Sequence, residues 1–272
     1  MRADLEKALD ANAPTGLGDR DRYVNAFIYG EYGVGKTINA CLCGAATGKR
    51  TLLIRTDTGT DSLYNHPELI PTVDVFDYAG LNQLTAIGNA ISEGLTLGGY
   101  DYSNVGLVVV DTISQVQEEY LDWILENFKF SGNFRTVATP RSSKIKTELK
   151  LEDEEITGLP DYHLARNKMR GPVKALIKAP CDVFFLAHLR EPSMLDVQKG
   201  KLVRRPTLTE TVFKLIAREV SLMGLMERVG PKREIQFETD KKTVSKSRIK
   251  ELEGKTINAD TLPQIIQDWR NS

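Results

Sequence analysis

The sequence predicts an α/β fold in which a mainly parallel central β-sheet is flanked by helices on both faces. Strand-like stretches alternate with helix-like stretches along most of the chain, which is typical of such sheets. One stretch, Val105 to Asp111, is an almost unbroken apolar run and favours a strand buried on both faces. The chain has 272 residues, 41% of them hydrophobic and 27% charged, so we expect a single domain over residues 1–272.

A phosphate-binding motif follows the first predicted strand, residues 23–29. Residues Gly30 to Thr37 read GEYGVGKT, match G-x-x-x-x-G-K-[ST] and lead into a predicted helix. Glycines permit positive φ angles and close approach, and the backbone N–H groups of such a loop bind phosphate at the positive end of a helix dipole. An ordinary glycine turn before a helix is the alternative interpretation.

The motif predicts a P-loop NTPase that binds ATP with Mg²⁺. Lys36 would contact the β- and γ-phosphates, and the hydroxyl of Thr37 would hold Mg²⁺. The residues expected to bind the nucleotide are Gly30, Glu31, Tyr32, Gly33, Val34, Gly35, Lys36, Thr37 and Ile38.

The remaining elements are predicted in order along the chain. An N-terminal helix and linker over residues 1–20 precede the first strand, and a mobile insertion is expected over residues 129–160. A C-terminal helix is expected over residues 255–272, and Thr261 is a candidate cap for it. Further strands are expected at 51–56, 72–77, 105–111, 182–187, 221–228 and 233–239, and further helices at 81–93, 114–127, 162–178, 209–217 and 262–270.

Three acidic or imidazole side chains at predicted strand ends are candidates for catalysis. Asp111 would hold Mg²⁺ opposite Thr37. Asp57 would orient the attacking water, with Asp61 as a substitute and a plain turn as the alternative. His188 would sense the γ-phosphate, because ligands bind at the carboxyl ends of parallel strands, although a structural imidazole would fit the sequence equally.

A basic pair near the end of the chain, Lys246 and Arg248, is two residues apart on a predicted extended segment, so both side chains point the same way. They could enter a neighbouring subunit's nucleotide site and offset phosphoryl charge there. A solvated basic surface is the alternative.

The succession of these motifs resembles the core of RecA-like recombinases. The phosphate loop, Ile54-Arg55-Thr56-Asp57, Leu107 to Asp111, Phe185 to Arg190 and Lys246-Ser247-Arg248 occur in the same order. More narrowly, the chain resembles the phage-encoded, nucleotide-binding AAA-type family that includes Sak4-like single-strand annealing proteins, over residues 23–249. The resemblance implies a RecA-like P-loop NTPase fold, an ATPase, and a homo-oligomer that forms a filament or ring.

The resemblance also implies roles for individual positions. Asp111 would be the Walker B aspartate, and Lys246 and Arg248 would act in trans. Asp57 stands where recombinases usually place a glutamate, and the shorter side chain suggests slow hydrolysis that DNA or assembly stimulates. The DNA-contacting loops would fall within residues 129–159 and 191–205, with these candidate cations: Arg135, Arg141, Lys144, Lys199, Lys201, Arg204 and Arg205.

We therefore expect an ATP-dependent ATPase that binds or anneals single-stranded DNA during phage recombination or replication. A nucleotide-gated protein-interaction module, such as a helicase loader or packaging accessory, is the alternative, and a small-molecule kinase is a third hypothesis. Partners would include single-stranded DNA and a phage or host single-stranded DNA-binding or replication protein. The net charge is −1 and no apolar run approaches membrane-span length, so we expect a cytoplasmic protein without membrane contact.

Overall fold

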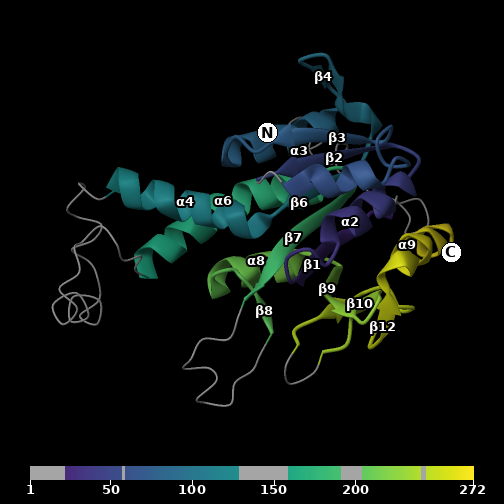
Figure 1. Ribbon diagram of the computed structural model, residues 1–272. Helices are drawn as coiled ribbons and strands as arrows, with labels where there is room; N and C mark the ends of the chain where they lie inside the picture. The colour runs from purple at the N-terminus through teal and green to yellow at the C-terminus, as the bar shows by residue number, and fades with distance from the viewer. Residues whose placement is uncertain (1–21, 57–58, 129–158, 191–203, 240–242) are drawn as a thin grey trace, which may run out of the picture.

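The computed structural model describes residues 22–56, 59–128, 159–190, 204–239 and 243–272 (Figure 1). Its central sheet has the strand order β12-β10-β9-β1-β7-β6-β2-β3, with β8 paired to β7 and β11 paired to β9. The strands are β1 (Asn25–Gly30), β2 (Arg50–Arg55), β3 (Val73–Asp77), β6 (Val105–Asp111), β7 (Asp182–Arg190), β8 (Arg205–Pro206), β9 (Leu222–Val229), β10 (Lys232–Gln236), β11 (Lys246–Ser247) and β12 (Thr256–Asn258).

Six neighbouring strands of this sheet are parallel, from β9 through β1, β7, β6 and β2 to β3. Strand β10 runs antiparallel to β9, and β12 runs antiparallel to β10. The mostly parallel α/β class predicted from the sequence is confirmed. Because the six parallel strands end at the same edge, residues far apart in the sequence meet there.

Helices cover both faces of the sheet, as predicted (Figure 1). On one face lie α2 (Lys36–Ala45) and α9 (Leu262–Asn271), and on the other lie α3 (Leu81–Glu93), α4 (Ile113–Phe128), α6 (Leu159–Lys178) and α8 (Glu210–Glu219). Strand β6 shows the cause: Val108 and Val110 join one buried cluster, whereas Leu107 and Val109 join the other. Alternate side chains of a strand point to opposite faces, so a continuous apolar run has to be covered twice.

Short elements complete the described chain. They are the 3-10 helices η2 (Gly59–Asn65), η3 (Tyr102–Asn104) and η4 (Ala259–Thr261), and a small hairpin of β4 (Thr96–Leu97) and β5 (Tyr100–Asp101).

The ends of the predicted elements need correction at several places. The segment 255–272 is not helical throughout: residues 256–258 form the edge strand β12, and α9 begins at Leu262. Thr261 does not cap α9 with its side chain, because its hydroxyl donates to the carbonyl oxygen of Asn258 at 2.7 Å. Strand β7 continues to Arg190 because its last two residues pair with β8. The expected N-terminal helix and residues 129–158 lie outside the described residues.

Candidate nucleotide-binding site

The phosphate loop lies between the last residue of β1 and the first residue of α2. Gly33 and Gly35 have φ angles of 68° and 98°, a region that side chains disfavour. Gly30 is required for a different reason, since a Cβ there would lie 2.2 Å from the carbonyl oxygen of Met226 on β9. Each glycine of the motif therefore answers a specific backbone requirement.

Lys36 is folded back over the loop and is only 6% exposed. Its Nζ donates to the carbonyl oxygens of Gly30, at 3.0 Å, and Glu31, at 2.7 Å. The ammonium group is thus held inside the curve of the loop, beside the N-terminus of α2, where phosphate oxygens would be its natural anionic partners.

Thr37 and Asp111 meet at the carboxyl edge of the sheet. The Thr37 hydroxyl donates to Oδ2 of Asp111 at 2.6 Å, across 74 positions of sequence. Thr56 holds the neighbouring strand ends together, since its backbone N–H donates to the carbonyl oxygen of Asp111 at 2.8 Å. The Thr56 hydroxyl also accepts from the backbone N–H of Thr112 at 2.9 Å.

This pair fits a magnesium ion chemically. A hydroxyl and a carboxylate are hard oxygen donors, and Mg²⁺ is commonly bound by one or two protein oxygens together with water and substrate phosphates. Within the described ranges no group of three or more His, Cys, Asp and Glu residues could hold a metal ion by itself. Thr37 and Asp111 would hold the ion, and the ion would neutralise phosphate charge.

His188 lies beside the phosphate loop. It is the register partner of Gly30 in the parallel pair of β7 and β1. Its ring stacks on Tyr32, with the ring centroids 3.8 Å apart and an interplanar angle of 20°, whereas Tyr32 itself is 77% exposed. The tip of the phosphate loop therefore contacts the strand that leads into residues 191–203.

The two predicted water-positioning residues cannot be placed. Asp57 lies outside the described residues, and of Asp61 only the backbone, in η2, is described. Thr56, the residue before Asp57 in the sequence, contacts Asp111 through its backbone N–H.

Lys246 and Arg248 lie away from their own chain's phosphate loop. Lys246 pairs with Met223 near the start of β9, whereas Gly30 pairs with Met226 further along that strand. The Lys246 ammonium donates to the carbonyl oxygens of Ala217 and Val220 at 3.0 and 2.7 Å, at the C-terminus of α8. Arg248 is exposed. In this conformation Lys246 stabilises a helix end, and the structure brings neither cation to its own site.

The candidate DNA-binding cations are only partly described. Arg135, Arg141, Lys144, Lys199 and Lys201 lie outside the described residues. Arg204 forms an ion pair with Glu227 at 2.5 Å, and Arg205 is exposed on β8.

Arg233 is a site residue that the sequence reasoning missed. A Cβ on Gly35 would lie 3.0 Å from an Nη1 of Arg233, so the guanidinium group rests against the residue that precedes Lys36. Arg233 is half-buried, and its side chain makes no hydrogen bond or ion pair with any part of the chain that the structure describes. Alternation along β10 could have indicated that Arg233 shares a face with the buried Ile235, but not that this face meets the phosphate loop.

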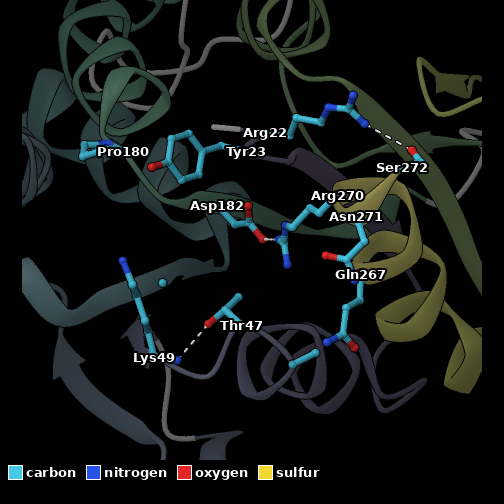
Figure 2. A pocket seen from close by; sticks show the side chains of 12 residues that line it. Arg22, Tyr23, Thr47, Lys49, Pro180, Asp182, Gln267, Arg270, Asn271 and Ser272 are labelled. Carbon is cyan, nitrogen blue, oxygen red and sulfur yellow. Dashed lines mark hydrogen bonds and ion pairs between the residues drawn. The ribbon is translucent and has the colours of Figure 1, made fainter. Parts of the chain in front are cut away.

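A pocket of about 680 Å³ lies at the amino edge of the sheet, opposite the phosphate loop, and belongs to no predicted site (Figure 2). At its centre, the buried Asp182 accepts a hydrogen bond from the backbone N–H of Val24 at 2.8 Å and forms an ion pair with Arg270. Figure 2 shows Arg270 of α9 reaching Asp182 at the start of β7. These contacts tie the C-terminal helix to the amino edge of the sheet.

The fold and the convergence of Lys36, Thr37 and Asp111 define a P-loop NTPase domain. A protein-family model described as an AAA domain matches residues 22–249, and the chain belongs to that family of nucleotide-dependent ATPases. Comparison with curated proteins gives no match. No helix in the described ranges is long and apolar enough to cross a membrane.

Proposed function

We propose that this chain is an ATP-dependent, RecA-like ATPase that binds single-stranded DNA and acts as a homo-oligomer in phage DNA recombination, annealing or replication. The phage context and the annealing activity rest on the resemblance of the motif succession. The observation that carries the proposal is the stack of Tyr32 on His188. It joins the loop that would bind the triphosphate to the strand that leads into one of the two predicted DNA-binding segments.

The contact suggests how nucleotide and DNA are coupled. A triphosphate would draw Lys36 away from the carbonyl oxygens of Gly30 and Glu31, and the loop tip that carries Tyr32 would adjust with it. Because His188 lies against that tip, β7 and the segment after it would respond to the nucleotide state. Coupling of this kind is reciprocal, so if ATP raises the affinity for DNA, DNA raises the affinity for ATP by the same factor.

The test is an ATPase assay with and without unstructured single-stranded DNA, at low and moderate salt, together with DNA binding in the presence of ATP, ADP or no nucleotide. We expect DNA to stimulate hydrolysis and ATP to tighten DNA binding. Lys36→Ala is the control that removes nucleotide binding. Absence of both stimulation and binding at low salt would reject the DNA part of the proposal while leaving the ATPase intact.

A second candidate, a nucleotide-gated protein-interaction module, is favoured by one surface feature. A cavity of about 580 Å³ lies between α3, α4 and α6, lined in part by Tyr120, Trp123 and Pro172. Trp123 is 44% exposed and stacks on Tyr120. Exposed aromatic residues are common at protein interfaces. If DNA neither binds nor stimulates, ATP-dependent binding of a purified replication protein that Trp123→Ala weakens would support this alternative.

A further inference from the structure

Of the eight described residues that line a groove between α6 and α8, five are cations. Its volume is about 370 Å³. The charged residues that line it are Arg166, Arg170 and Lys174 from α6, Lys214 and Arg218 from α8, and one acid, Glu219. The chain as a whole carries a formal net charge of −1, so this concentration of positive charge is local.

The cations form two stripes. Arg166, Arg170 and Lys174 recur every four residues and therefore follow one side of α6, with a rise of about 6 Å between successive members. Lys214 and Arg218 repeat the same spacing on α8, which packs against α6. The two stripes line opposite walls of the groove.

The like-charged pairs within each stripe do not stabilise the helices. Like charges at positions i and i+4 destabilise a helix by roughly 0.2–0.5 kcal/mol for each pair, and the stripes contain three such pairs. Lys214 has an ion pair with Glu210 at 2.7 Å. The side chains of the other four cations form no hydrogen bond or ion pair with other described residues. A cluster of cations with so few counter-charges among the described residues indicates an anionic partner.

The scaffold of the groove is rigid. Val173 and Ile216 on the inner faces of the two helices are fully buried in the core, and Leu215 closes the groove between the stripes. Lys246 caps the C-terminus of α8 through two hydrogen bonds. The backbone positions from which the cations project are therefore set before any ligand binds.

We propose that this groove binds the sugar–phosphate backbone of single-stranded DNA. The evenly spaced cations suit a chain of regularly spaced phosphates, and no aromatic residue is among the described residues that line the groove, so these contacts would be independent of base sequence.

The inference rests on the proposed function and deepens it. In the sequence, α6 begins directly after residues 129–158, and α8 follows residues 191–203 and β8. Both helices thus continue from the two segments in which DNA contacts are expected. The groove would extend the path of the strand along the protein, and every residue named in it is described.

The experiment compares two triple variants with equal loss of charge. Arg170→Gln/Lys214→Gln/Arg218→Gln removes exposed cations of the groove, and Lys232→Gln/Lys250→Gln/Lys255→Gln removes exposed cations elsewhere. Binding of a fluorescent oligothymidylate is measured by anisotropy over a salt series with ATP present. For single-stranded DNA, the slope of log K against the logarithm of the salt concentration decreases in magnitude by about 0.7 for each phosphate contact removed. The groove variant, with three cations removed, should therefore have a slope smaller in magnitude by about 2 and should bind about 100-fold more weakly near 0.1 M salt.

Each outcome has a distinct meaning. The control variant should bind nearly as wild type does, and the groove variant should keep the wild-type melting temperature and basal ATPase rate. If wild type binds DNA and the groove variant binds it equally well, the groove inference is wrong and the proposed function stands. If wild type binds no DNA, the proposed function fails. Binding of fluorescent polyglutamate instead, lost in the groove variant, would overturn the DNA assignment in favour of an acidic protein segment.

Discussion

Replacing Arg233 by alanine tests whether the phosphate loop is completed by a cation from β10. The guanidinium group lies against Gly35, is half-buried, and has no hydrogen bond or ion pair with other described residues. A half-buried cation without an internal counter-charge is costly, and a triphosphate in the adjoining loop would supply that counter-charge. We therefore expect Arg233→Ala to weaken nucleotide binding.

The magnitude follows from the kind of contact. A hydrogen bond to a charged group contributes about 1.5–3 kcal/mol, and each 1.4 kcal/mol is tenfold in affinity. Arg233→Ala should therefore raise the Kd for ATP by roughly 10- to 150-fold. ADP should be affected similarly, because the loop residues beside Gly35 surround the α- and β-phosphates. Titration calorimetry with ATP, ADP and AMP would measure the differences.

Two comparisons separate this role from a structural one. Arg233→Ala should change the stability of the nucleotide-free protein by about 0.5 kcal/mol or less, because no described hydrogen bond is lost. Lys232→Ala, on the same strand but on the opposite face, should leave ATP affinity unchanged. Wild-type ATP affinity in Arg233→Ala would refute the reasoning, as would an equal loss in Lys232→Ala.

Four further predictions concern individual side chains. Asp111→Asn should weaken Mg²⁺–ATP binding by roughly 10- to 100-fold but should not weaken binding in EDTA, because the carboxylate attracts the nucleotide only through the ion. Equal weakening in EDTA would contradict this. Arg248→Ala should bind ATP normally and turn over slowly, and mixing it with Lys36→Ala subunits should restore activity; normal turnover of Arg248→Ala alone would exclude action in trans. Asp182→Ala should lower the free energy of unfolding, measured with a chemical denaturant, by about 3–5 kcal/mol, because Arg270 loses its ion pair and the backbone N–H of Val24 loses its acceptor. A loss below about 1 kcal/mol would show that water replaces both interactions. Burial, together with the charge of Asp111, raises the pKa of Cys41 to about 12. Burial also raises the pKa of Cys181 to about 12, and it raises the pKa of Cys43. A thiol reagent at pH 8 should therefore modify none of these buried cysteines in the native protein and all three after unfolding.

The sequence by itself determined the local parts of the site. The phosphate loop could be recognised because its glycines, Lys36 and Thr37 are adjacent in the chain and each meets a local backbone or chemical requirement. Asp111 could be recognised because it ends a strand whose apolar run shows burial on both faces. Parallel strands end at a common edge, so its meeting with Thr37 was predictable once the α/β class was known.

Tertiary structure decided the contacts that depend on which strands are neighbours. Arg233 reaches Gly35 because the antiparallel pair β9–β10 lies beside β1, an order that the residues of β10 do not encode. Lys246, predicted to act on a neighbouring subunit, caps α8 because β11 pairs with the start of β9. The cations of α6 and α8 form one groove only because the two helices pack side by side, 40 or more positions apart in the chain. Local chemistry is written in adjacent residues, whereas long-range proximity results from how the whole sheet and its helices pack.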